Sequence, residues 1–121
     1  MELLTKAAWL GLAAIHATPS LAVFMPSLIQ RLYGVPPSGS VGMLLTHRGA
    51  LFLGVFALAV LAAFDETSRR AGALVVGISM IGFLIVYTNA GSPAGALRTI
   101  ALTDAAGLPL LALVTWEAFR R

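Results

Sequence analysis

Four long apolar segments, at residues 4–24, 43–64, 71–87 and 97–119, constrain this chain more than any other feature of its sequence. A helix that crosses a membrane needs about 20 mostly apolar residues. A backbone in lipid must satisfy its own hydrogen bonds, so long apolar runs without alternation form helices. The segments therefore predict an all-α fold: an integral membrane antiparallel four-helix bundle, formed by one transmembrane domain over residues 1–121.

The composition supports lipid as the solvent of this chain. Its residues are 59% hydrophobic and 11% charged, whereas soluble domains have about 25% charged residues. A soluble chain of 121 residues buries too little of its surface to hide so many apolar side chains. The absence of cysteine excludes disulfides and thiolate catalysis. Like charges never run beyond two residues, which argues against a nucleic-acid partner.

The connections between the segments carry turn-forming and polar residues. Pro26 and residues 34–39 mark a long first connection. Within it, apolar residues at helical spacing over 28–33 indicate a short helix that lies at the membrane interface. In the second connection, Thr67 or Ser68 is expected to cap the third long helix.

The basic residues predict how the bundle sits in a membrane, because short cytoplasmic loops carry an excess of Lys and Arg. Those on the side of the two termini are Lys6, Arg69, Arg70, Arg120 and Arg121. Only Arg31 and Arg98 fall on the opposite side. We therefore expect a multi-pass protein of the bacterial inner (plasma) membrane with both termini in the cytoplasm. Trp9, Trp116 and Phe119 would then form a cytoplasmic aromatic belt.

Small residues at four-residue spacing indicate where helices approach each other closely in lipid. The candidate contact points are Ala7 with Gly11, Ala50 with Gly54, Ala73 with Gly77, and the single glycines Gly82 and Gly107.

Polar residues inside or beside the apolar segments gather near one end of the predicted bundle. They form the candidate ligand-binding cluster His16, His47, Arg48, Asn89, Arg98 and Asp104. A lone charge near the bilayer centre costs at least about 2.5–3.5 kcal/mol on insertion scales, so such groups should face the bundle interior. The second and fourth segments run parallel, which puts Arg48 and Asp104 both roughly 10 Å below the same side. We expect these two residues to pair.

Each member of the cluster also has a structural explanation. The Arg48–Asp104 pair could be a tether between helices or part of a site. His16 could hydrogen-bond a carbonyl that Pro19 frees, or have a functional role. His47 could extend its ring to the interface.

As a site, the cluster has more positive than negative charge, since Arg48 and Arg98 outnumber Asp104. That balance suits an anionic headgroup or a polar quinone-like ring with an apolar tail between helices. No pair of metal-ligating residues shares a helix face, and Arg48 would repel a cation, so neither a metal nor another cofactor is expected. The catalytic residues stay unknown, because the serines lack a nucleophile signature and no glycine-rich phosphate loop is present.

Short motifs give the chain a family resemblance. They are Leu32-Tyr-Gly-Val35, Leu45-Thr-His-Arg-Gly-Ala-Leu-Phe52, Ala62-Ala-Phe64, Ser79-Met80, Asn89, Arg98 and Asp104-Ala-Ala-Gly107. This pattern resembles a group of small bacterial four-helix membrane proteins similar to the DoxX-like superfamily, often labelled phosphopantetheine adenylyltransferase. The resemblance implies that His47, Arg48 and Asp104 belong to a shared pattern, and it carries no activity over. A soluble adenylyltransferase has an α/β fold and a phosphate motif, and this sequence has neither.

Two hypotheses for the function follow. The lack of a catalytic motif and of a domain outside the membrane favours an accessory or assembly bundle that associates with a partner protein or with itself among membrane lipids. The alternative is a lipid- or quinone-handling membrane protein, an enzyme or a carrier, with a polar pocket at the outer face. A small transporter is less favoured, because no helix looks broken at matching points in two halves.

Overall fold

The computed structural model describes residues 1–120, and every regular element in that range is helical. The helices are α1 (Glu2–Leu21), α2 (Ser27–Tyr33), α3 (Gly39–Phe64), α4 (Arg69–Asn89) and α5 (Ala96–Phe119), with a short 3-10 turn η1 (Glu66–Ser68) before α4. The predicted all-α class is therefore confirmed.

The four long helices follow the predicted segments, with shifted ends. α1 ends at Leu21 rather than at residue 24, since the chain beyond Pro19 continues in tight turns. α3 begins at Gly39 rather than at residue 43, directly after the extended Ser38. The short helix predicted in the first connection is α2. It stops at Gly34, which adopts a left-handed conformation (φ 73°) that costs glycine nothing.

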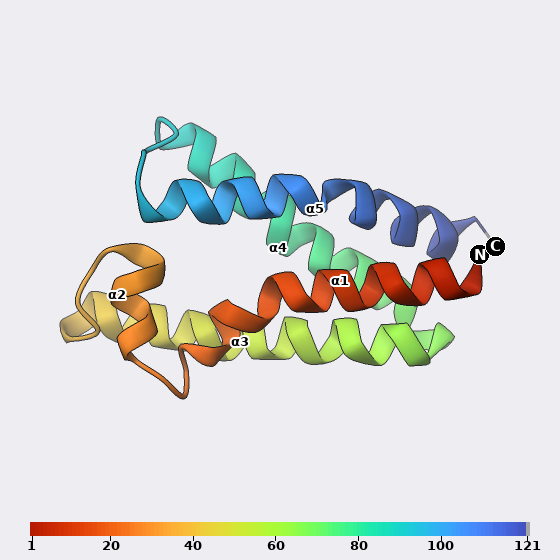
Figure 1. Ribbon diagram of the computed structural model, residues 1–121, viewed down its shortest axis with the longest axis horizontal. Coiled ribbons are helices and arrows are strands. Elements are labelled where there is room, and N and C mark those ends of the chain that lie inside the picture. The colour runs from red at the N-terminus through yellow and green to blue at the C-terminus, as the bar shows by residue number, and fades with distance from the viewer. Residues whose placement is uncertain (121) are drawn as a thin grey trace.

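Figure 1 shows the four long helices running alternately in opposite directions along the molecule. α1 packs along α3 and also contacts α5, while α4 packs mainly against α5 and crosses the other helices obliquely. α2 and its two connections lie at one end of the molecule, beside the start of α5, and the start of α1 lies at the other end. Residues from α1, α3 and α5 can therefore meet beneath α2.

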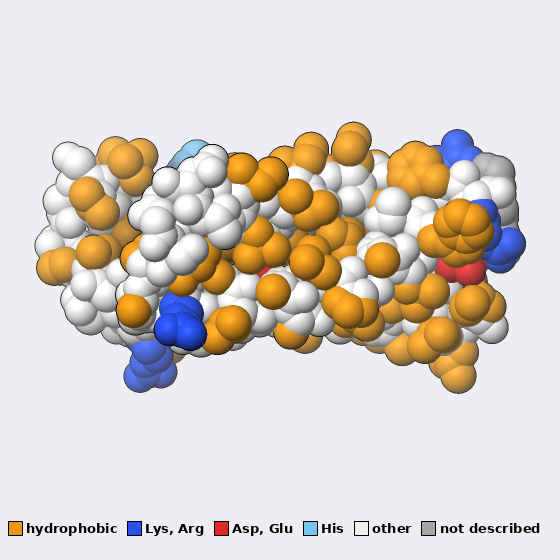
Figure 2. Space-filling model, turned by 90° about the horizontal axis from the view of Figure 1, so that it is seen from above, with side chains coloured by type: hydrophobic (Ala, Val, Ile, Leu, Met, Phe, Trp, Pro, Cys, Tyr) orange, Lys and Arg blue, Asp and Glu red, His pale blue; other side chains and the backbone are white. Residues whose placement is uncertain are grey.

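Alanines make up eight of the fifteen buried hydrophobic residues within residues 1–120, and many large apolar residues face outward. The buried alanines are Ala8, Ala13, Ala22, Ala59, Ala62, Ala63, Ala73 and Ala101. By contrast, Leu3 is 80% exposed and Ile78 is 66% exposed. The face in Figure 2 has Lys and Arg near both ends and a broad band dominated by hydrophobic side chains between them. Close packing through small residues with apolar side chains outside is the arrangement of helices in lipid.

Three of the helices are long and apolar enough to cross a membrane: α3, α4 together with η1, and α5. In their most apolar stretches only 11%, 22% and 28% of the residues are buried. Such extensive exposed apolar surface indicates a membrane protein. α1 is not one of the three, because its 20 residues include Lys6, His16 and Pro19. The expectation of four spanning helices is therefore met in part.

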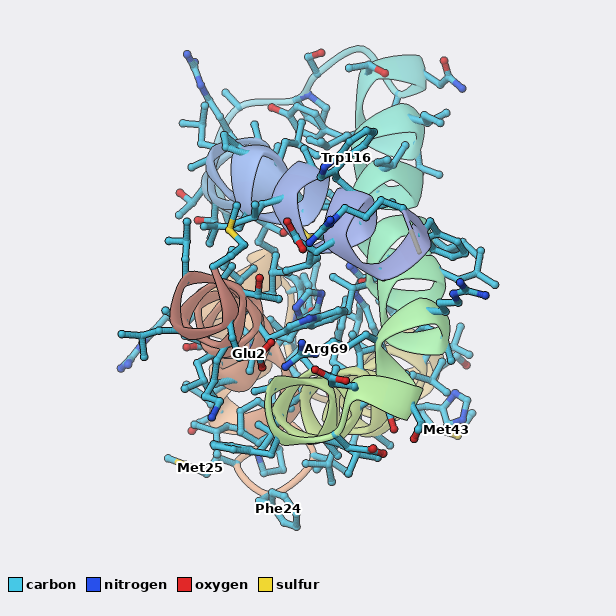
Figure 3. All side chains as sticks on the ribbon, turned by 90° about the vertical axis from the view of Figure 1, so that its right-hand side faces the viewer. Glu2, Phe24, Met25, Met43, Arg69 and Trp116 are labelled. Atoms are coloured by element: carbon cyan, nitrogen blue, oxygen red, sulfur yellow. The ribbon has the colours of Figure 1, made fainter. Side chains whose placement is uncertain are left out.

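The end of the molecule that holds the start of α1 is closed by Arg69 (Figure 3). Its Nε donates to the Ala62 carbonyl at 2.8 Å, and its Nη2 donates to the Ala63 carbonyl at 3.1 Å. Its two Nη atoms also pair with the Glu2 carboxylate at 3.0 and 2.7 Å. Arg69 thus satisfies carbonyls at the end of α3 and ties α1 to the start of α4.

The connection before α4 is stabilised differently from the expectation. Ser68 stands at the cap position of α4 but makes no side-chain cap bond. Asp65 instead accepts hydrogen bonds from the Thr67 amide and hydroxyl and from the Ser68 hydroxyl. These bonds hold the pKa of Asp65 below its usual range. Asp65 therefore caps η1, and the side-chain cap expected for α4 is not formed.

The aromatic belt predicted for this end is wrong for Trp9. Its side chain is fully buried in the core, against Gly72 of α4, and its Nε1 has no hydrogen-bond partner within residues 1–120. Trp116 and Phe119 are 67% and 54% exposed, as a belt would require.

Gly49 marks a close backbone approach between α3 and the end of α1. A Cβ at this position would lie 3.0 Å from the Val23 nitrogen and 3.2 Å from the Pro19 oxygen. Gly107 is similarly tight, but against the side-chain ends of Ile15 and Met80. The expected close approach is confirmed for Gly107. For Gly54 and Gly82 it is wrong, because nothing in the described part of the chain lies within 4 Å of a Cβ placed there.

We expect Gly49→Ala to destabilise the fold by about 1–3 kcal/mol, because backbone atoms cannot move aside as a flexible side chain can. Gly54→Ala on the same helix is the matched control, and it should be neutral or stabilising by up to about 1 kcal/mol through higher helix propensity. Both values can be measured by denaturant unfolding in detergent micelles, followed by circular dichroism. Equal effects of the two substitutions would show that the α1–α3 contact is not tight.

Candidate functional site

A cavity of about 270 Å³ lies beneath α2, where α1, α3 and α5 come together. Its polar and aromatic lining residues are His16, Thr18, Tyr33, Arg48, Phe52, Thr99, Thr103 and Asp104. Three of the six residues of the predicted cluster therefore meet here, each from a different helix: His16 from α1, Arg48 from α3 and Asp104 from α5.

The other three predicted members do not line this cavity. His47, Asn89 and Arg98 are exposed at the surface. His47 directly precedes Arg48, and neighbouring residues of a helix point about 100° apart, so the two cannot both face the cavity. Asn89 stands at the last residue of α4 and Arg98 in the first turn of α5.

Asp104 carries the least satisfied polar group of the cavity. Its side chain faces the cavity and the residue is only 8% exposed. Within residues 1–120 it makes no hydrogen bond within 3.5 Å and no ion pair within 4.0 Å. Its carboxylate oxygens are therefore available to accept hydrogen bonds from a group that enters the cavity.

Arg48 lies among three aromatic rings. Its guanidinium carbon is 4.5 Å from the centroid of Phe52, 5.4 Å from that of Phe83 and 5.8 Å from that of Tyr33. Its Nε donates to the Tyr33 hydroxyl at 3.2 Å. An arginine has five N–H donors, and the four on the Nη atoms of Arg48 have no acceptor among the described residues. The rings hold the guanidinium in place while leaving its donors available.

The predicted direct pair between Arg48 and Asp104 is wrong in its geometry. No ion pair within 4.0 Å joins them in the described part of the chain. They line the same cavity and interact electrostatically across it. The physical reason is the Arg48–Tyr33 hydrogen bond together with the ring contacts, which turn the guanidinium toward the rings of α2, α3 and α4.

His16 links α1 to α4. Its Nδ1 lies 2.9 Å from the Leu12 carbonyl, and its Nε2 lies 3.0 Å from the Ser79 hydroxyl. A carbonyl only accepts, so Nδ1 carries the proton and Nε2 accepts from Ser79. The acceptor of His16 is the Leu12 carbonyl, one helical turn before His16, and not the carbonyl four residues before Pro19. The interpretation that His16 bonds a carbonyl freed by Pro19 is therefore wrong. Both ring nitrogens are therefore occupied, and His16 forms part of the cavity wall.

Sequence reasoning missed the aromatic residues around Arg48. Phe52 could have been found, because it follows Arg48 by one helical turn, where side chains meet. Tyr33 and Phe83 come from other helices and carry no local signal. Ser79, which sequence reasoning named only within a short motif, donates a hydrogen bond to His16.

Comparison of the chain with protein-family models, with characterised proteins and with solved structures finds no match. The resemblance to the DoxX-like superfamily stays a prediction. The fold and the cavity therefore have to carry the functional argument themselves.

Proposed function

We propose that this chain is a membrane-embedded binding protein for a small amphipathic molecule, lipid-like or quinone-like, whose polar part occupies the cavity beneath α2. The observation that carries the proposal is Asp104: an acidic residue, 8% exposed, that makes no hydrogen bond or ion pair among residues 1–120 and lines the same cavity as Arg48, whose Nη donors are unused there. A ligand with polar atoms would satisfy both groups at once, which is why such convergent polar groups mark binding sites.

The proposal includes a bundle of four membrane-spanning helices, with α1 as the fourth. Apart from the Trp9 indole, the buried polar side chains of α1 have hydrogen-bond partners within the protein. Thr5 donates to the Met1 carbonyl, Ser20 donates to the Ala17 carbonyl, and His16 bonds Leu12 and Ser79. α1 also packs along α3 and α5, which supports its insertion beside them.

The charges at the two ends support an orientation in a bacterial inner membrane. Lys6, Arg69 and Arg120 belong to the end that holds the start of α1, while Arg31 and Arg98 belong to the α2 end. Arg121, which was counted with the first group, lies outside the described residues. By the excess of positive charge in the cytoplasm, both termini are cytoplasmic and the cavity faces the outer half of the membrane.

The shape of the cavity fits the polar part of a ligand rather than a whole one. Its volume of about 270 Å³ lies just below the ~300–1,000 Å³ of pockets that enclose a complete small molecule. Ala14 and Thr18 of α1, and Thr99 and Thr103 of α5, line it and are themselves exposed. The ligand would enter between α1 and α5 and leave its apolar part against the outside of the helices.

A groove between α4 and α5 supports a second candidate function, association with a partner helix or with a second copy. It has a volume of about 990 Å³, and its lining is apolar or small except at the Arg120 end. Gly77 and Gly82 of α4 contribute to it, and small residues are what lets helices approach in lipid.

We expect Thr103→Phe to remove the bound molecule, because a phenyl ring at position 103 fills the mouth of the cavity without changing any charge. Ala105→Phe is the matched control, since Ala105 is exposed on the same helix and does not line the cavity. Native mass spectrometry of protein extracted in mild detergent would show the ligand on the wild type and on Ala105→Phe. An unchanged ligand occupancy in Thr103→Phe would contradict the proposal. The same spectra report a dimer or a co-purifying protein, as the second function requires.

A further inference from the structure

The cavity beneath α2 offers one positive and one negative side chain, and from this we infer the charge of its ligand. Building on the proposed function, we propose that the site binds a zwitterionic phosphoamine group. Its phosphate would pair with Arg48 and its primary ammonium with Asp104. A phosphatidylethanolamine headgroup has this chemistry.

The charge inventory of the cavity supports this assignment. Arg98 and His47, which gave the sequence its expected positive excess, lie outside. Among the described residues the charged lining consists of Arg48 and Asp104, and both nitrogens of His16 are already hydrogen-bonded. A purely anionic headgroup would satisfy Arg48 but place its charge against Asp104 in a medium that screens poorly. A ligand that carries both charges can pair with Arg48 and with Asp104 at the same time.

The guanidinium of Arg48 has the geometry of a phosphate-binding group. The Nε is used by Tyr33, so the pair of Nη atoms forms the free fork of the guanidinium. Such a fork binds two oxygens of a phosphate side by side. The rings of Phe52 and Phe83 lie against the guanidinium and help to fix its position.

Asp104 has the chemistry that the positive end of such a ligand requires. An ionised carboxylate only accepts hydrogen bonds, and a primary ammonium offers three donors. The hydroxyl of the neighbouring Thr103 donates to the Thr99 carbonyl and does not complete Asp104. The absence of a direct ion pair between Arg48 and Asp104 leaves the space that the headgroup would bridge.

Delipidated protein in detergent, titrated with three lipids of identical acyl chains and followed by native mass spectrometry, tests the inference. Phosphatidylethanolamine should bind about tenfold more tightly than anionic phosphatidylglycerol, which is the usual effect of one charged hydrogen bond. Phosphatidylcholine should bind more weakly than phosphatidylethanolamine, because its trimethylated ammonium has no N–H donor. Phosphatidylglycerol binding as tightly as phosphatidylethanolamine would overturn the assignment.

The same headgroup chemistry could come from a membrane lipid or from a free, soluble phosphoamine. Soluble glycerophosphoethanolamine, added as a competitor, distinguishes the two. Weak competition supports a membrane lipid as the ligand, as the opening between α1 and α5 suggests. Competition at the concentration of the lipid itself supports a free phosphoamine in the same site.

Substitutions assign each end of the headgroup. Asp104→Asn should abolish the preference for phosphatidylethanolamine over phosphatidylglycerol, and Arg48→Gln should weaken both lipids about tenfold or more. Arg98→Gln, outside the cavity, should change neither. An unaltered preference in a folded Asp104→Asn protein would contradict the inference. If that variant does not fold, the series of lipids on the wild type decides alone.

The outcomes separate this inference from the proposed function. Lipid that binds without headgroup preference and is displaced by Thr103→Phe would refute the zwitterion and leave the binding function standing. No bound lipid in the wild type, and no effect of Thr103→Phe, would refute both.

Discussion

Arg69→Ala is expected to lower the free energy of unfolding by about 3 kcal/mol, the lower end of the ~3–5 kcal/mol found when a buried ion pair loses one partner. The lower end applies because the Glu2 side chain is 54% exposed while that of Arg69 is 9% exposed. The loss includes hydrogen bonds to the Ala62 and Ala63 carbonyls, which would be left without this donor. Unfolding of the purified protein by a denaturing detergent, followed by circular dichroism, measures the change.

Arg98→Ala is the matched control for this substitution. Arg98 is an exposed arginine at the opposite end, and its removal should change stability by less than about 0.5 kcal/mol. Glu2→Gln should show a smaller loss than Arg69→Ala, because it leaves the carbonyl contacts of Arg69 intact. A loss below about 1 kcal/mol for Arg69→Ala would mean that this end is held by packing alone.

Arg48→Ala has the second large expected effect. Among the described residues that line the cavity, it leaves Asp104 as the single charged one, and an uncompensated charge within a bundle costs about 2.5–3.5 kcal/mol on insertion scales. It also removes the cation from the rings of Phe52, Phe83 and Tyr33. The same unfolding measurement should therefore show a loss of about 3 kcal/mol.

The double variant Arg48→Ala with Asp104→Asn separates the two causes. If charge balance dominates, the double variant should recover most of the stability that Arg48→Ala alone loses. A double variant as unstable as Arg48→Ala would show that Arg48 acts through its aromatic contacts and that Asp104 is tolerated by itself.

The part of the site that could be predicted follows from distance along helices. Arg48 and Asp104 share a depth because α3 and α5 start at the same end, and the rise of a helix is fixed. His16 joins them because α1 runs the other way and ends beneath α2. Which face of each helix points to the interior was harder to predict. A helix that is apolar on all sides has no sequence pattern that distinguishes its inner face from its outer face. His47 was included for that reason, although it points away.

The contacts that depend on several helices at once could not be predicted. Trp9 has the amphipathic ring typical of an interface, yet it lies in the core, because Gly72 of α4 leaves room for it. Arg69 looked like a loop charge that sets orientation, and it is instead a buried cross-link. In both cases the partner lies more than 60 positions away in the sequence, so no local pattern carries the signal.

The Glu2–Arg69 contact has a consequence for how the chain is assembled. The two residues are 67 positions apart, a stretch that takes about 3–13 s to synthesise at the usual ~5–20 residues per second. The other acceptors of Arg69 are the Ala62 and Ala63 carbonyls at the end of α3, which are synthesised only seven and six residues before it. The contact that ties α1 to the start of α4 therefore cannot form until α1 and α3 have both been synthesised in full.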